Sequence, residues 1–199
     1  MNNKRVPIRA VVRVRPHETG GCEPCVAKTS ACSIQLLPSR ATASGAHAEP
    51  KTFTLDAVFD GGTQEELFEE ARPLVRDAID GYNATIFAFG CTGSGKTHTM
   101  SGPRSAPGIM PRAVSLIFSE VQRRTQLDES AAFLVRVSFV ELYNNNFRDL
   151  LSSRNGGTAC APSEVRIREG AQGPHLVGSS SLRTPVRSAK EALALIVRG

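Results

Sequence analysis

The amino-acid sequence predicts an α/β domain, and three features of the chain support this class. Apolar runs of strand length alternate with stretches of helical periodicity along most of the 199 residues. A glycine-rich loop, residues 90–97, stands between one such run and a short helical segment. Two strand-like pieces, residues 165–168 and 175–177, flank glycines and suggest a hairpin. We therefore expect a central, mixed and mostly parallel sheet flanked by helices, with all of residues 1–199 in one domain.

The first third of the chain contains three expected strands. In order, they are residues 8–15, 33–37 and 51–56. Residues 17–50 are rich in Gly, Ser, Thr, Ala and Pro, and we interpret them as a variable surface excursion that contains the second strand. Residues 58–62 are expected to turn away from the third strand.

A long helix is expected after this turn. Thr63 and Glu66 have the spacing of a capping box, and apolar residues then recur on one helical face until Gly81. Pro73 lies inside this pattern and should kink or split the helix. The apolar, β-branched and aromatic run of residues 84–89 is then expected to form a strand that is buried on both faces.

The second half of the chain continues the alternation. A helix is expected from Pro111 to about residue 124, because proline suits the first helical turn. The further expectations are a long strand at 133–142, a turn at 144–146, a short helix at 147–151, a loop at 152–163, the hairpin, and a final helix from the capping box of Ser188 and Glu191 to Gly199.

Composition narrows the class of protein. The hydrophobic content is 40%, the formal net charge is +5, and the apolar runs are too short to span a bilayer. No secretory signal pattern opens the chain, so we expect a cytoplasmic protein without a membrane or nucleic-acid partner, although an acidic polymer is permitted. The five cysteines are expected to be reduced thiols. A zinc site at His17, Cys22, Cys25 and Cys32 is the alternative to a plain surface loop there.

The glycine-rich loop carries the chemistry. It reads Gly90-Cys91-Thr92-Gly93-Ser94-Gly95-Lys96-Thr97 and matches the G-x-x-x-x-G-K-[ST] pattern. In this pattern backbone N–H groups surround phosphates, the lysine reaches the β- and γ-phosphates, and the threonine hydroxyl binds Mg²⁺. Cys91 is expected to be a small filler, with a reactive thiol as the alternative. A flexible Gly/Ser linker is the competing interpretation of the whole loop.

Several ordered motifs resemble the kinesin motor domain. The longest is residues 81–100, G-Y-N-A-T-I-F-A-F-G-C-T-G-S-G-K-T-H-T-M. Residues 12–16 (V-R-V-R-P), 108–114 (G-I-M-P-R-A-V), 139–144 (F-V-E-L-Y-N) and 149–151 (D-L-L) follow the family's order. The resemblance covers essentially the whole chain. It implies ATP or ADP with Mg²⁺ as ligands, microtubules (tubulin) as the track, and an adenine-binding wall of Arg13, Arg15, Pro16 and His98. It also implies that the loop at 152–163 and the neighbouring hairpin contact the microtubule.

The chain departs from the family in one respect. The two switch motifs of kinesins, N-x-x-S-S-R-S-H and D-x-A-G-x-E, have no counterpart in it. They position the attacking water and support magnesium, so no catalytic residue is identifiable and we expect weak or absent hydrolysis by this N-terminal part of the domain. The alternatives are a nucleotide-binding or microtubule-associated module that does not cycle, and a different P-loop enzyme. Direction of movement, cargo and oligomeric state are not readable from the sequence.

Overall fold

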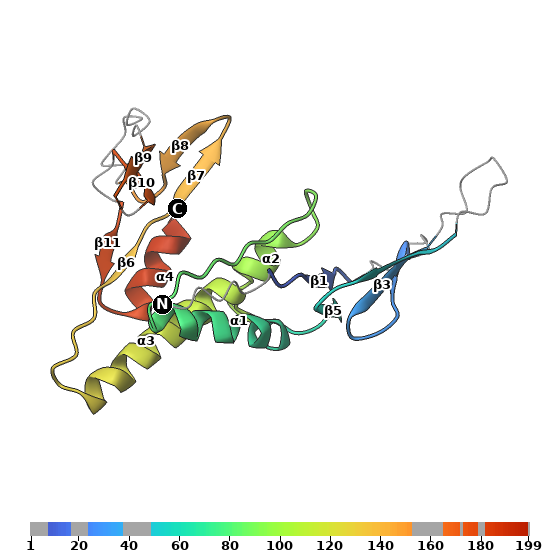
Figure 1. Ribbon diagram of the computed structural model, residues 1–199, viewed down its shortest axis with the longest axis horizontal. Coiled ribbons are helices and arrows are strands. Elements are labelled where there is room, and N and C mark those ends of the chain that lie inside the picture. Colours follow the sequence, from blue (N-terminus) through green and yellow to red (C-terminus); the bar gives the residue numbers. More distant parts are fainter. Residues whose placement is uncertain are drawn as a thin grey trace. The chain divides into compact units, whose positions relative to one another are not determined.

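The computed structural model describes residues 8–16, 24–37, 49–152, 165–171, 173–178 and 182–198. These residues belong to two compact units. The first unit consists of Met1–Pro73 with Thr85–Ile109, and the second consists of Leu74–Ala84 with Met110–Gly199. Figure 1 labels the helices and strands of both units. The candidate phosphate loop lies in the first unit.

Two small sheets build the strand framework of the first unit. Strand β1 (Val11–Val14) pairs in parallel with β5 (Ala57–Asp60). An antiparallel sheet contains β2 (Val26–Lys28), β3 (Ser33–Leu36) and β4 (Lys51–Thr54) in that order. Strands β1, β3 and β4 were predicted. The interpretation of residues 58–62 as a turn was wrong for its first part, because Val58 pairs with Val12 and only Gly61 and Gly62 turn.

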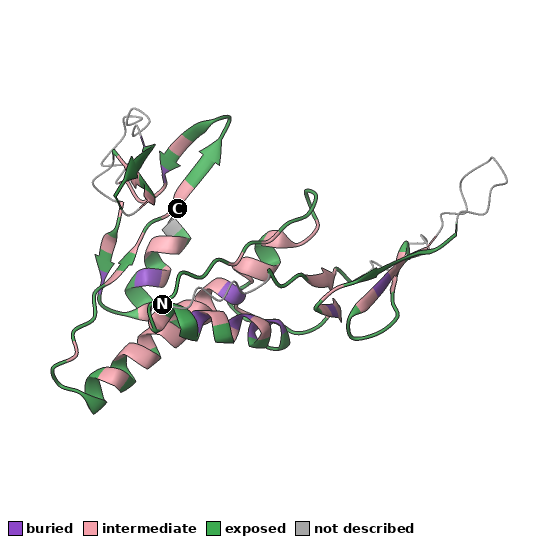
Figure 2. Cartoon of the chain, in the orientation of Figure 1, coloured by how far each residue is buried: buried purple, intermediate pink, exposed green. Residues whose placement is uncertain are grey.

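Helix α1 (Gln64–Ile79) confirms the predicted caps at both ends. The Glu66 carboxylate accepts from the Thr63 N–H at 2.8 Å, and the Glu66 N–H donates to the Thr63 hydroxyl at 3.1 Å. At the other end, Gly81 has φ of 98°, and the N–H of Tyr82 bonds to the carbonyl of Asp77 in a Schellman arrangement. Figure 2 shows buried residues along one face of α1. The helix runs without interruption through Pro73, so the expected split does not occur.

Residues 84–89 do not form the expected strand. They belong to no strand, and no ladder of the described residues includes them. A strand forms when its backbone N–H and C=O groups pair with a neighbouring strand, and no such neighbour is present in the described part of the chain. Phe87 and Phe89 are consequently 71% and 96% exposed. The short helix α2 (Lys96–Met100) follows the glycine-rich loop, as predicted.

In the second unit, helix α3 (Ile109–Leu127), whose first residue belongs to the first unit, begins two residues before the predicted start at Pro111. The long strand expected at 133–142 is divided into β6 (Val135–Val137) and β7 (Val140–Tyr143). The division has a topological cause, because β6 pairs with β11 (Thr184–Val186) whereas β7 pairs with β8 (Asn146–Asp149). The helix predicted at 147–151 is therefore wrong for most of its length.

The described part of the second unit contains two hairpins. Asn144 and Asn145 both have positive φ, 48° and 61°, which is the geometry of the two-residue loop that joins β7 to β8. Strand β9 (Arg166–Gly170) pairs with β10 (Gly173–Val177), so the predicted hairpin is confirmed.

The last element is α4 (Ala189–Arg198), at whose start the Ser188 hydroxyl accepts from the Glu191 N–H at 3.2 Å. The Glu191 carboxylate accepts from the N–H of Arg187. The expected helix end at Gly199 and almost all of the 152–163 loop lie outside the described residues. The α/β class is confirmed, with one parallel ladder and otherwise antiparallel ladders in the described residues. None of the described helices has both the length and the apolar character needed to cross a membrane.

Candidate functional site

The glycine-rich loop forms a tight turn before α2. The N–H of Ser94 bonds to the carbonyl of Cys91 at 3.2 Å, and the N–H of Thr99 bonds to the carbonyl of Gly95 at 2.9 Å. Gly93 and Gly95 have φ of 79° and 100°, a region that residues with a side chain rarely adopt. No side chain caps the start of α2. The loop therefore presents backbone rather than side chains along the turn.

Lys96 folds back over this turn. Its Nζ donates to the carbonyls of Gly90 and Cys91, at 2.9 and 2.8 Å. An ammonium group has three donors, so this arrangement holds the charge at the loop and leaves donor capacity for an anion. Thr97 is the next residue, and its side chain is exposed. The lysine and the threonine thus stand at the start of one helix, beside the turn.

Arg15 and the loop are brought together although 78 positions separate Arg15 from Gly93. The Arg15 Nη1 donates to the Gly93 carbonyl at 2.6 Å. Pro16 follows Arg15 and is exposed, and the side chain of His98 is exposed on α2. The end of β1 is therefore anchored to the phosphate loop through Arg15.

Arg13 makes four hydrogen bonds within the first unit. Its Nε and Nη2 donate to the carbonyls of Gly61 and Gly62, at 3.2 and 3.1 Å. Its Nη1 donates to the side chains of Gln64 and Thr99, at 2.8 and 3.1 Å. The guanidinium thus joins the turn after β5, the start of α1 and the end of α2.

Gln64 and Thr99 are members of this arrangement that the sequence did not single out. Gln64 is only 5% exposed, and its Nε2 donates to the His98 carbonyl at 2.6 Å. In the sequence Gln64 follows a helix cap and reads as an ordinary surface position of the first turn. Its burial depends on residues far away in the chain, so no local signal indicated it.

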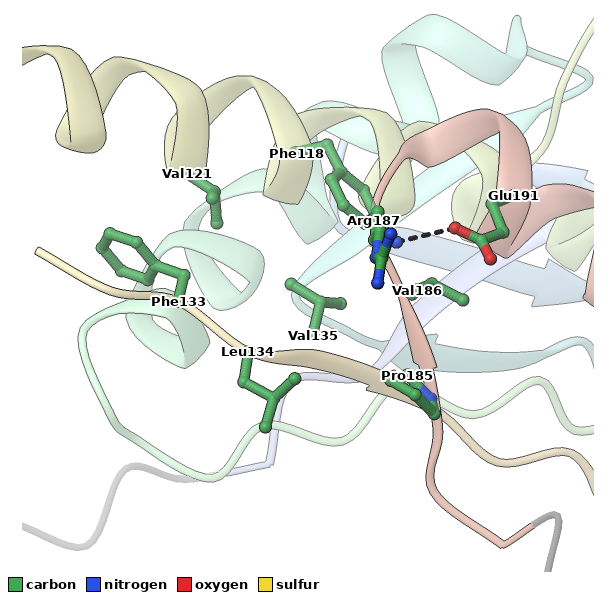
Figure 3. A pocket seen from close by; sticks show the side chains of 9 residues that line it. All are labelled: Phe118, Val121, Phe133, Leu134, Val135, Pro185, Val186, Arg187 and Glu191. Carbon is green, nitrogen blue, oxygen red and sulfur yellow. Dashed lines mark hydrogen bonds between the residues drawn. The ribbon is translucent and has the colours of Figure 1, made fainter.

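The second unit contains a cavity. It has a volume of about 660 Å³ and lies between α3, β6, β11 and the start of α4 (Figure 3). Its walls are mainly apolar, with Phe118, Phe133 and Val135 among them. The one interaction drawn there joins the Glu191 carboxylate to the backbone N–H of Arg187 at 2.8 Å. No predicted site residue contributes to this cavity.

The described residues include only some of the ligands predicted for zinc and magnesium. Cys25, Cys32 and Cys91 are exposed free thiols. His17 and Cys22 lie outside the described residues, so the zinc alternative is not tested. Within the described ranges, no cluster of three or more His, Cys, Asp or Glu residues is placed to hold a metal ion. For magnesium, the exposed Thr97 hydroxyl is a hard oxygen ligand of the kind that this ion prefers.

A glycine-rich turn with Lys96 folded over it, on an α/β scaffold, defines the fold of the chain as that of a P-loop protein. The kinesin motor domain model matches residues 13–199. The chain belongs to the kinesin motor domain family.

Individual kinesins show the extent of the similarity. The chain is 36% identical to the chromosome-associated kinesin KIF4 of Mus musculus over 180 residues, which are 83% of this chain and 13% of that protein. It is 34% identical to the kinesin-like protein KIF27 of Homo sapiens over 206 residues, 98% of this chain and 13% of that protein. The chain therefore spans about an eighth of the length of these relatives.

A solved structure shows the same fold. It is a KIF14 dimer in a two-heads-bound state, described as AMP-PNP in complex with a microtubule. The TM-score is 0.82 at 28% sequence identity, and the match covers 96% of this chain and 53% of that chain. The P-loop fold of the kinesin type is thus confirmed for this chain.

Proposed function

We propose that this chain supplies the nucleotide-binding part of a microtubule-stimulated motor ATPase, with Mg-ATP and Mg-ADP as its ligands. The observation that carries the proposal is the position of Lys96, whose Nζ lies within 2.9 Å of two loop carbonyls in a chain of the kinesin motor domain family. The KIF14 relative with AMP-PNP supports the choice of an adenine nucleotide.

Each part of the loop has a defined role in this proposal. The backbone at Gly93 and Gly95 approaches the phosphates, and a Cβ added at Gly95 would meet no atom within 4 Å, so the space before the turn is open. Lys96 supplies a point charge to the β- and γ-phosphates. Thr97 supplies a hydroxyl ligand to Mg²⁺, which neutralises phosphate charge when bound.

Arg15, Pro16 and His98 remain the proposed adenine contacts. The Arg15 bond to Gly93 holds the end of β1 beside the phosphate loop, which is where a base attached to bound phosphates has to lie. A proline ring and an imidazole offer flat faces to an adenine ring, and both residues are exposed. Arg13 was expected in the same wall, and its contacts lead to a different proposal below.

Microtubules are the proposed partner, and an association with the cytoskeleton of the cytoplasm follows from that partner. The support is the KIF14 relative in complex with a microtubule. In this chain the β9–β10 hairpin presents Arg166 and Arg168 at exposed positions, which suits an acidic surface. The 152–163 loop is part of the same proposal.

Hydrolysis by these 199 residues alone is proposed to be weak or absent. The chain lacks both switch motifs, and it covers 53% of the KIF14 chain. The same observation supports a second candidate function, a module that binds nucleotide without cycling. The two candidates differ in whether microtubules accelerate phosphate release by a chain that also contains the switch motifs.

Titration calorimetry with Mg-ATP tests the proposal. The wild-type chain should bind, and Lys96→Ala should weaken binding by about a hundredfold, since a charge-assisted phosphate contact is lost. Lys51→Ala is the matched control, because Lys51 is an exposed lysine on β4 of the same unit. Failure of the wild-type chain to bind would contradict the proposed function.

Phosphate release in the presence of microtubules tests the proposed lack of hydrolysis by this chain. The chain should show little release, with or without microtubules, because it lacks the groups that orient water and sense the γ-phosphate. Strong stimulation by microtubules would show that the missing switches are not needed and would contradict this part of the proposal.

A further inference from the structure

The buried polar side chain of Gln64 connects Arg13 to the carbonyl of His98 in α2. It is 5% exposed and starts α1. Its Oε1 accepts from Arg13 Nη1 at 2.8 Å, and its Nε2 donates to the His98 carbonyl at 2.6 Å. The orientation of the amide follows from chemistry, since a guanidinium can only donate and a carbonyl can only accept. Both ends of the amide therefore have a fixed partner.

The His98 carbonyl is an end group of α2. The last carbonyls of any helix lack a partner within the helix. The next available N–H, that of Gly102, bonds to the carbonyl of Thr97 at 3.1 Å, and the Ser101 N–H bonds to the same carbonyl. Gln64 supplies the donor that the helix itself does not give to His98. The side chain thus closes the C-terminal end of α2.

Arg13 holds the same end of α2 from a second direction. Its Nη1 donates to the Thr99 hydroxyl at 3.1 Å as well as to Gln64. Its remaining bonds go to the carbonyls of Gly61 and Gly62 in the turn before α1. Arg13 is therefore directed at protein groups on three sides. An arginine used in this way is poorly placed to stack on a base as well.

We infer that Gln64 and Arg13 are positioning residues that fix α2, and through it Lys96 and Thr97, rather than contacts to the base. The inference rests on the proposed function for its ligand, and its geometry stands on five hydrogen bonds, two made by Gln64 and three further ones made by Arg13. Helix α2 has only five residues, so bonds at His98 and Thr99 act within one turn of the lysine and the threonine. Ligand binding should therefore depend on Gln64 and Arg13 whichever base the nucleotide carries.

The test compares ligands that share phosphates and differ in the base. Affinities for Mg-ADP, Mg-GDP and magnesium tripolyphosphate are measured by calorimetry on the full chain. Gln64→Leu keeps the size of the side chain and removes both bonds, and Arg13→Ala removes the guanidinium. Gln122→Leu is the matched control at an exposed glutamine of α3. His98→Ala is the comparison for a residue proposed to contact the base.

Gln64→Leu loses two hydrogen bonds of ordinary net strength, and Arg13→Ala loses four, of which two go to Gln64 and to Thr99 of α2. Each variant should weaken the binding of all three ligands by about tenfold. The ratio of ADP to GDP affinity should stay within about twofold of wild type, as expected when no base contact is lost. Gln64→Glu keeps the acceptor for Arg13 and loses the donor to His98, so it should fall between wild type and Gln64→Leu. For Arg13→Ala, a changed ADP to GDP ratio with unchanged tripolyphosphate binding would overturn the inference.

Amide hydrogen exchange tests the geometry without any nucleotide. In Gln64→Leu the amides of Thr99, Ser101 and Gly102 should exchange faster, whereas those of the β7–β8 hairpin should not change. Unchanged exchange at these three amides would overturn the inference, whatever the ligands do. A wild-type chain that binds none of the three ligands would contradict the proposed function, and the exchange result would then decide the inference separately.

Discussion

Two helices that start in the first unit begin in opposite ways. At the start of α1, Thr63 and Glu66 bond to each other's backbone N–H groups in a closed capping box. At the start of α2, Gly95 has φ of 100° and no side-chain cap is present. The first four N–H groups of a helix always need partners from outside. A closed start serves the fold, whereas under the proposed function the start that follows the glycine-rich loop leaves its donors to the phosphates.

The largest expected effect comes from giving the open start a side chain. Gly95→Val places a β-branched residue at φ of 100°, a conformation that such residues avoid. The loop should rearrange, and Mg-ADP affinity should fall roughly a hundredfold when calorimetry measures it. The midpoint of thermal unfolding, followed at the β7–β8 hairpin, should change little. An affinity within about threefold of wild type would show that the turn geometry is not required.

A smaller effect is expected at the first glycine of the loop. A Cβ added at Gly90 would lie 2.5 Å from the Ser94 hydroxyl oxygen and 3.1 Å from its Cβ. Gly90→Ala should therefore push Ser94 aside and weaken Mg-ADP by about tenfold. Adding Ser94→Gly removes both colliding atoms and should restore part of the affinity. A double variant that binds no better than the single one would contradict this steric explanation.

The closed start should respond differently. Thr63→Ala removes the hydroxyl that accepts from Glu66, and loss of such a cap costs about 1 kcal/mol of unfolding free energy. Denaturant unfolding followed by circular dichroism measures this change. The affinity for Mg-ADP should remain within about twofold, because the cap donates nothing to the loop. A tenfold loss of affinity would mean that the cap of α1 also contributes to the binding of Mg-ADP.

The smallest effect is a pH dependence confined to the closed start. The bond from the Thr63 backbone N–H, and then its side chain, lower the pKa of Glu66 from its usual 4.5. A carboxyl with a lowered folded-state pKa stabilises the protein above pH 4.5, and this contribution is lost as the pH falls through the folded-state pKa. Glu66→Gln should remove this acid sensitivity of α1. Identical acid unfolding of wild type and variant would contradict the assignment.

Local signals in the sequence were sufficient for the caps of α1, the asparagine turn and the tight turn of the glycine-rich loop. Thr63 with Glu66, Gly81 and the residues 90–97 act through their own neighbours, so their geometry follows from a few adjacent residues. The Asn144–Asn145 turn was predictable for the same reason.

Features that depend on distant partners were predicted less well. The run at 133–142 is two strands because its halves pair with β11 and β8, and residues 147–149 belong to a strand because the asparagine turn aligns them with β7. Residues 84–89 have the composition of a buried strand and no ladder among the described residues. At the site, Gln64 and the contacts of Arg13 with Gln64 and Thr99 were missed, because contacts across 34 to 86 positions leave no periodic pattern.

The most direct test follows each backbone amide at the two helix starts during a titration with Mg-ADP. Amide ¹H–¹⁵N chemical shifts of the chain are followed as Mg-ADP is added. The largest changes should occur at Gly93, Gly95, Lys96 and Thr97, while the amides of Glu65, Glu66 and Leu67 at the closed start should change little. Equal changes at both starts, or none at the loop under conditions where Mg-ADP binds, would contradict the account of the glycine-rich turn as the phosphate-binding element.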